Sequence, residues 1–288
     1  MIPRRMTLTE ASDLLSVTHS PGLQDMACDG SPGNQGKEMI ENIEQLLAHI
    51  DEAEGVVGAI LVGSSTEDYK DNLSDFDVEI IKGNGEPEPL KCFAEPIRIS
   101  RRLDLSYVDL GSFLNKRSSP KDVDHWPYQG CRILYDPKGV LHREVAAIIA
   151  IDPEVRMQRV CLHFFEFIYY ARRFNKLESR PSALNRSMAA AKAVESLIKT
   201  LFLAHRRWPP LLHWSEQQLR GLGAPSELLS DVVGLLESPD RATAQRLEAS
   251  LRSELSRLEG NVLPDDERLV REVTSMRFQA ARELYSSF

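Results

Sequence analysis

The sequence predicts an α+β protein, in which a domain with a mixed β-sheet flanked by helices is followed by an all-α helical bundle. Three observations support this. Between about residues 38 and 150, runs with strand periodicity alternate with helical runs and turns. After that point strand signals stop and only helical periodicity continues. A chain of 288 residues with 42% hydrophobic content can also bury the cores of two domains.

These signals divide the chain into three parts. Residues 1–37 are expected to be a flexible N-terminal extension, because the stretch 20–36 is rich in glycine and proline. Residues 38–150 form the predicted sheet domain, which is the candidate catalytic domain. Residues 151–288 form the predicted helical domain.

The first elements of the sheet domain have clear patterns. Apolar residues recur at helical spacing over 37–53, and Gly55 ends that helix. The apolar, β-branched run 56–62 predicts a buried strand that ends at Gly63. Residues 75–81 then alternate between apolar and acidic side chains, which predicts a strand with one buried and one acidic face.

The remaining elements follow in order. Residues 97–108 and 131–135 predict two further strands, and the second ends in a turn over 136–139. Helical periodicity covers 155–174, 182–205, 216–222, 226–236, 242–259 and 265–285.

Composition narrows the range of partners. The net charge of −8 argues against a broad nucleic-acid interface, because phosphate binding requires clustered Lys and Arg. The four cysteines show no metal-type spacing and are expected to be reduced thiols. No apolar run reaches the length of a membrane helix, and none follows the N-terminus as in a secretory signal. We therefore expect a cytoplasmic protein without a membrane partner.

The candidate site begins where the first buried strand ends. Gly63 lacks a side chain, so backbone there can approach a ligand closely, and Ser64 supplies a hydroxyl beside it. Asp75 and Asp77 lie on the next strand and point to the same side, because strand side chains alternate. Two neighbouring carboxylates repel each other unless a cation lies between them, and their hard oxygens suit Mg²⁺.

A third carboxylate would complete a site for two metal ions. Asp104 is the best candidate, because it lies between two leucines on a predicted strand, where an unpaired acid is costly. Asp109 is the alternative, five residues further along the same strand. Glu79 shares a face with Asp77 but lies farther from the turn, which favours a helper role or a solvated position.

The spacing of these residues resembles a known family. Gly63-Ser64, ten intervening residues and then Asp75-x-Asp77 are similar to the signature of the DNA polymerase β-like nucleotidyltransferases. The resemblance is closer to the minimal and antibiotic-modifying branch, such as the aminoglycoside adenylyltransferases. Residues 132–139 and 207–214, and the helical second half, are also similar to that branch.

The resemblance implies site residues and cofactors. Asp75, Asp77 and Asp104 would be catalytic and hold two Mg²⁺ ions, with ATP or another nucleoside triphosphate as substrate. The predicted nucleotide-binding residues around the turn are Gly63, Ser64, Ser65, Lys70 and Ser74. Lys70 is the only base between the turn and Asp75, although this family often has Arg or Lys directly after the turn.

Lys192, Glu195 and Lys199 share one face of a predicted helix. The lysines are candidates for binding triphosphate, and Glu195 is a candidate general base, as a carboxylate from the helical half is in antibiotic-modifying relatives. The alternative is an exposed salt-bridge ladder that stabilises the helix.

The resemblance implies transfer of a nucleoside monophosphate, AMP in the case of ATP, to a hydroxyl of a small polar acceptor such as an antibiotic, with release of pyrophosphate. Two alternatives remain open. In the first, the chain adenylylates a partner protein, as antitoxin-like members of the family do. In the second, it binds nucleotide as a regulatory protein and catalyses no reaction.

Overall fold

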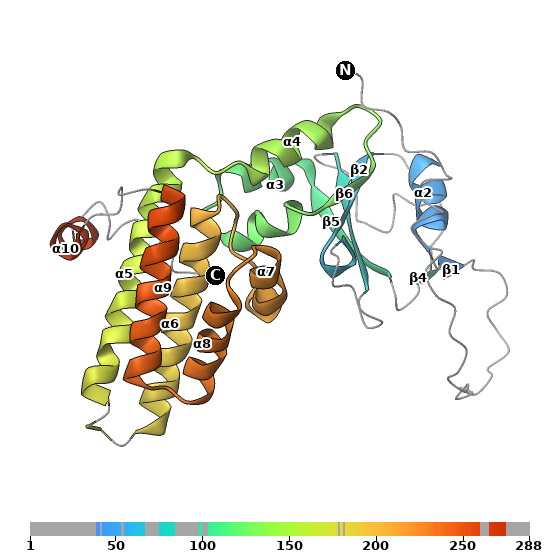
Figure 1. Cartoon of the computed structure of the whole chain (residues 1–288). Coiled ribbons are helices and arrows are strands. Elements are labelled where there is room, and N and C mark those ends of the chain that lie inside the picture. The colour runs from blue at the N-terminus through green and yellow to red at the C-terminus, as the bar shows by residue number, and fades with distance from the viewer. Residues whose placement is uncertain are drawn as a thin grey trace, which may run out of the picture. The chain divides into compact units, whose positions relative to one another are not determined.

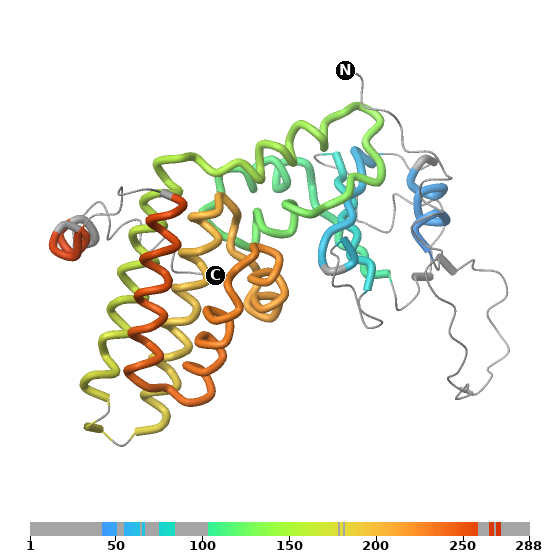
Figure 2. Tube along the Cα trace, viewed as in Figure 1, coloured from blue at the N-terminus to red at the C-terminus, as the bar shows by residue number. Residues whose placement is uncertain are grey.

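The computed structural model describes residues 39–40, 42–52, 55–66, 75–83, 98–99, 103–177, 179–180, 182–259 and 265–274 (Figures 1 and 2). The predicted extension over 1–37 lies outside these residues. The chain forms two compact units, of which the first comprises 1–66, 70–113 and 132–140, and the second 67–69, 114–131 and 141–288. The second unit thus includes 114–131 and 141–150, which the sequence-based division assigned to the sheet domain.

The first unit is built on a four-stranded mixed sheet with the strand order β5-β3-β2-β6. Its strands are β2 (Val56–Val62), β3 (Phe76–Lys82), β5 (Leu103–Asp109) and β6 (Arg132–Tyr135). β2 pairs antiparallel with both β3 and β6, whereas β3 and β5 run parallel. The predicted mixed sheet is therefore confirmed, as are the strands expected over 56–62 and 75–81.

One face of this sheet packs on helix α2 (Ile43–Glu52). Leu46 and Ile50 of the helix form a buried cluster with alternate residues of the strands, among them Leu61, Val78 and Leu103. Because strand side chains alternate, the residues between these apolar positions lie on the opposite face of the sheet. That opposite face carries Asp77 and Glu79 of β3 and Asp104 of β5.

The helix predicted over 37–53 begins later than expected. Met39–Ile40 forms a short strand, β1, which pairs parallel with β4 (Arg98–Ile99). Asn42 then caps α2, because its Oδ1 accepts a hydrogen bond from the backbone N–H of Gln45 at 2.9 Å. The strand expected over 97–108 is likewise wrong as a single element, since β4 and β5 belong to different sheets.

The region after β5 contains elements that the sequence patterns did not predict. Helix α3 (Leu110–Asn115) follows β5 directly, and three short 3₁₀ turns follow it: η3 (Lys116–Ser118), η4 (Asp122–Asp124) and η5 (Trp126–Tyr128). Helix α4 (Val140–Ile149) was also not predicted. All are short, and short helices carry too few turns for a clear periodicity.

The described part of the second unit is helical (Figure 1). Its later elements are α5 (Pro153–Leu177), α6 (Ala183–Ala204), η6 (Leu212–Trp214), α7 (Ser215–Gly221), α8 (Ser226–Glu237), α9 (Arg241–Glu259) and α10 (Asp266–Thr274). Helices α5 to α9 match the predicted ranges within a few residues. The last predicted helix is seen to Thr274, and its expected remainder over 275–285 lies outside the described residues.

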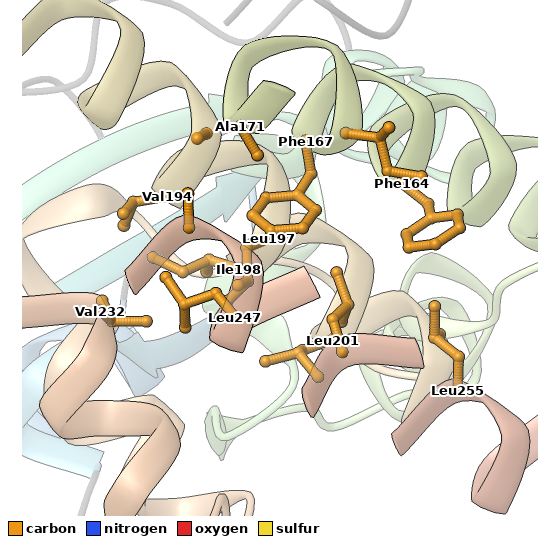
Figure 3. Close-up of a cluster of buried hydrophobic side chains, with 14 of the residues drawn as sticks. Phe164, Phe167, Ala171, Val194, Leu197, Ile198, Leu201, Val232, Leu247 and Leu255 are labelled. Atoms are coloured by element: carbon orange, nitrogen blue, oxygen red, sulfur yellow. The ribbon is translucent and has the colours of Figure 1, made fainter. Parts of the chain in front are cut away.

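The core of the second unit lies between α5, α6, α8 and α9 (Figure 3). Phe164 and Phe167 of α5 are fully buried against Leu197 and Leu201 of α6 and Leu247 of α9. Helix α5 contains several further aromatic residues, and most of them also pack in or against this core. Among the described residues, no helix combines the length and the apolarity that crossing a bilayer requires.

Candidate functional site

The parallel pairing of β3 and β5 brings two acids together. Asp77 and Asp104 are direct partners in the register of the two strands. Neighbouring strands lie about 4.8 Å apart, so side chains at paired positions emerge side by side from the same face. This is the face opposite α2, and Asp104 is exposed there while Asp77 is half-buried.

The electrostatics of Asp77 show that a third acid is close by. Burial raises the pKa of Asp77 above its ordinary value, and the charges of Asp104 and Asp75 raise it further. Asp75 lies one residue before β3 and is exposed. None of these three acids forms a salt bridge with another residue that the structure describes. The described residues therefore leave their negative charge uncompensated. A cation bound among them would relieve the repulsion.

Gly63 is packed directly on the carboxylate of Asp77. The chain leaves β2 at Val62, which pairs with Asp77, and Gly63 then turns with φ +79°. A Cβ atom at this position would lie 2.2 Å from Oδ2 of Asp77 and 3.2 Å from its Cγ. Glycine is thus required twice, for the left-handed backbone and for the space that the carboxylate occupies. The sequence predicted that Gly63 permits a close approach, and in the structure the group that approaches is Asp77.

The turn after Gly63 is a short 3₁₀ helix, η1 (Ser64–Thr66). The Thr66 hydroxyl donates to the carbonyl of Gly63 at 2.8 Å, and the Thr66 N–H donates to the same oxygen at 3.2 Å. Ser65 is buried, and its hydroxyl lies 3.5 Å from the carbonyl of Val62, the long limit for a hydrogen bond. These contacts hold the shape of the turn.

Three predicted nucleotide-binding groups lie outside the described part of the structure. They are the side chain of Ser64 and the whole of Lys70 and Ser74. Their assignments remain predictions.

Asp109, the alternative third acid, has another role. It ends β5 and caps α3, because its Oδ1 accepts a hydrogen bond from the backbone N–H of Ser112 at 2.9 Å. Hydrogen bonds from the side chain and backbone of Ser112 hold the pKa of Asp109 below its ordinary value. Asp109 lies five positions after Asp104, an odd number, so the two side chains point to opposite faces of the sheet. The geometry therefore favours Asp104.

The donor chemistry of the acid cluster fits magnesium, which prefers carboxylate oxygens. The described residues contain no group of three or more His, Cys, Asp or Glu side chains placed closely enough to hold a metal ion. Magnesium is commonly bound through only one or two carboxylates, with water and substrate phosphates completing its shell. The adjacent pair Asp77 and Asp104 matches that mode.

Glu195 forms a ladder with two lysines on α6. Lys192 Nζ lies 2.8 Å from one carboxylate oxygen and Lys199 Nζ lies 3.0 Å from the other. Burial raises the pKa of Glu195, but the hydrogen bond from Lys192 and the charge of Lys199 outweigh it and hold the pKa below its usual value. A carboxylate held ionised in this way is a weak proton acceptor. The contacts favour the ladder over a general base.

We expect Glu195→Gln to lower the free energy of unfolding by about 1–3 kcal/mol, because Lys199 is buried and loses its carboxylate. The ladder contributes stability above the ordinary pKa of glutamate and loses it as the pH falls through the lowered pKa. Urea unfolding and turnover should be measured together. Lys192→Gln, at a side chain that is 54% exposed, is the control and should cost less than about 1 kcal/mol. A collapse of turnover in Glu195→Gln with an unchanged unfolding curve would instead support the role of base.

The second unit also contains a buried polar network that sequence patterns did not reveal. Arg159 is fully buried and forms an ion pair with Asp122 of η4. Its guanidinium lies 5.1 Å from the ring centre of Trp208, and the His125 ring stacks on Trp208 at 3.7 Å. Gln129 exchanges two hydrogen bonds with the backbone of Trp208. Trp208 is therefore a core residue. A buried arginine on a helix has the same sequence pattern as an exposed one. The sequence therefore did not reveal that Arg159 is buried.

No protein-family model matches the chain, and no curated protein sequence matches it. Among solved structures, it is similar to a nucleotidyltransferase-like protein from Exiguobacterium sibiricum 255-15, at 14% sequence identity over 84% of this chain and 86% of that chain, with a TM-score of 0.42.

Proposed function

We propose that the chain is a magnesium-dependent nucleotidyltransferase that moves a nucleoside monophosphate, AMP from ATP, onto a hydroxyl of a small polar acceptor and releases pyrophosphate. The observation that carries the proposal is the in-register pair Asp77 and Asp104, with Asp75 beside it and Gly63 packed on Asp77. This arrangement concentrates on one face of the sheet, next to a tight turn, carboxylates that form no salt bridge with the residues the structure describes. Such a cluster is costly for the fold, which favours a functional origin.

Each residue of the cluster has a proposed task. Asp77 and Asp104 would hold Mg²⁺, and Asp75 would complete the acidic set or hold a second ion. When bound, magnesium neutralises charge that develops on the phosphates and lowers the pKa of the attacking hydroxyl. Gly63 keeps the Asp77 carboxylate in place. The backbone and hydroxyls of 63–65, with Lys70 and Ser74, would contact the triphosphate. Lys192 and Lys199 remain weaker candidates for that contact, because both bind Glu195.

Nucleotide binding should depend strictly on the divalent ion. Without Mg²⁺, the negative charges of the triphosphate would lie close to three carboxylates. Unit charges of like sign about 4 Å apart repel by about 4 kcal/mol near a protein surface. We therefore expect the affinity for ATP to fall at least about tenfold when Mg²⁺ is removed with EDTA, as measured by isothermal titration calorimetry. Equal affinity with and without Mg²⁺ would favour a regulatory protein that binds nucleotide without chemistry.

The test of the activity is transfer of label from α-³²P-ATP in the presence of Mg²⁺. A panel of aminoglycosides and lincosamides supplies the acceptors, since the net charge of −8 suits a cationic acceptor such as an aminoglycoside. Transfer of label to a small molecule, abolished in Asp104→Asn, is the expected result and would point to a role in antibiotic resistance. Label on a protein instead would indicate modification of a partner. No transfer to either acceptor would contradict the proposal.

A further inference from the structure

A cavity in the second unit lies between helices α5 and α10. Its volume is about 340 Å³. Phe165 and Ile168 of α5 and Leu269 and Val270 of α10 supply its apolar walls. Tyr169 also lines it and is 44% exposed, as a residue at the mouth of a binding pocket would be. These residues have no part in the nucleotidyl transfer proposed above.

The wall that α10 provides is anchored to the rest of the unit. Leu269 is 1% exposed and belongs to the core of the second unit. Asp266 accepts hydrogen bonds from Arg172 at 2.8 Å and from Arg252 at 2.7 Å. Arg172 also binds Glu248 at 2.8 Å. Among the charged residues that line the cavity, Arg172 and Asp266 are thus satisfied by partners within the fold.

Two other cations line the cavity, and neither forms a salt bridge with a described residue. They are Arg173 and Lys176 of α5. The Arg173 guanidinium lies 4.3 Å from the ring centre of Tyr169 and donates a hydrogen bond to the Tyr169 hydroxyl. This contact holds the cation at the aromatic edge of the cavity. The lining of the cavity therefore combines apolar walls with a charged rim, which consists of the side chains of Arg173 and Lys176.

We propose that this cavity binds a small amphipathic anion, an apolar ring system that carries one carboxylate or phosphate. The apolar part would lie against Phe165, Leu269 and Val270, and the anionic group would face Arg173 and Lys176. An engineered cavity of roughly 150 Å³ takes up benzene, so a cavity of this volume has room for about two fused rings. Pockets that combine apolar walls with a few polar groups are typical of small-molecule sites.

The test uses three probes with the same naphthalene body and different charge. They are naphthalene-2-carboxylate, the neutral naphthalene-2-carboxamide and the cationic 2-naphthylmethylammonium. Binding to the full chain is measured by isothermal titration calorimetry without nucleotide, so the result is independent of the transferase activity. The expected order of affinity is anion, then neutral probe, then cation. Indifference to charge, or no binding of any probe, would overturn the proposal.

Two variants locate the binding. Arg173→Gln combined with Lys176→Gln should weaken the anion roughly fivefold and leave the neutral probe unchanged, because only the anion uses the charged rim. Val270→Asp, at a position that is 46% exposed, places a negative charge in the apolar wall and should weaken both probes while the fold is retained. Arg220→Gln, on α7 and outside the lining, is the matched control and should bind as the wild type does. If Arg220→Gln weakened the anion as much as the double variant, the affinity would come from general surface charge and the proposed site would be wrong.

Discussion

Asp77→Asn is expected to abolish nucleotidyl transfer and, at the same time, to make the metal-free protein more stable. Loss of a metal-binding carboxylate removes several kcal/mol of transition-state charge stabilisation, which corresponds to about a thousandfold or more in rate. The gain in stability has a separate cause. Burial, Asp104 and Asp75 all raise the pKa of Asp77, so the ionised carboxylate is unfavourable in the folded state.

The sign of the pH dependence follows from this raised pKa. Between the ordinary and the raised pKa of Asp77, the folded state holds more protons than the unfolded state, so the free energy of unfolding falls as the pH rises through that window. Above the raised pKa the whole penalty is present. Asparagine cannot ionise, so the variant should lack this fall. Its melting temperature without metal should exceed that of the wild type by a few degrees, because solvent screens part of the repulsion at this half-buried site.

Thermal unfolding and turnover of the same samples check both halves of this prediction. Mg²⁺ should raise the melting temperature of the wild type more than that of Asp77→Asn. Asp109→Ala is the control, because it removes an acid from the other face of the same sheet. It should lose some stability, because the helix cap of α3 is removed, and keep its turnover. A destabilised Asp77→Asn would show that Asp77 supports the fold rather than a ligand.

The acidic face of β3 was predictable from the sequence, and its flanking leucines made Asp104 the preferred third acid, but the pairing of Asp104 with Asp77 was not predictable. Alternation along 75–81 shows which residues share a face, since the side-chain period of a strand is two. It does not show which residue of another strand lies opposite. The choice between Asp104 and Asp109 depended on the register of β5 against β3, a contact between distant parts of the chain. The structure favours Asp104, which pairs with Asp77, and shows that Asp109 caps α3.

The errors in the fold have the same origin. Helical spacing predicted a helix from residue 37, but pairing of Met39 with Arg98 turns its start into a strand. That pairing joins segments almost sixty residues apart, and a local pattern does not contain it. The helices of the second unit were predicted well because their long apolar faces meet the core at regular spacing, as Phe164, Phe167 and Ala171 do.

Gly63→Ala is expected to remove most of the activity although it deletes no functional group. Two effects act at this position. An alanine at φ +79° costs roughly 1–2 kcal/mol of backbone strain. In addition, its Cβ would lie 2.2 Å from Oδ2 of Asp77, so the carboxylate must move. A displacement of about 1 Å in a reacting geometry can cost a hundredfold in rate.

Gly139→Ala separates the two effects. Gly139 also has a left-handed backbone, with φ +67°, but a Cβ there would meet no atom within 4 Å. The two variants should therefore share the loss of stability from strain, and only Gly63→Ala should lose turnover by about a hundredfold. Urea unfolding and steady-state kinetics of both proteins make the comparison. Equal turnover in the two would mean that the position of the Asp77 carboxylate does not matter for the reaction.

A double-mutant cycle shows whether the clash with Asp77 is the cause. In an Asp77→Ala background the obstructing Oδ2 and Cγ atoms are gone, so adding Gly63→Ala should cost only the backbone strain, as Gly139→Ala does. Stability is the readout, because Asp77→Ala is expected to be inactive. A coupling energy near zero between the two positions would mean that Gly63 is needed for its backbone conformation alone. A clear coupling would establish that the turn after β2 and the carboxylate on β3 are positioned by each other.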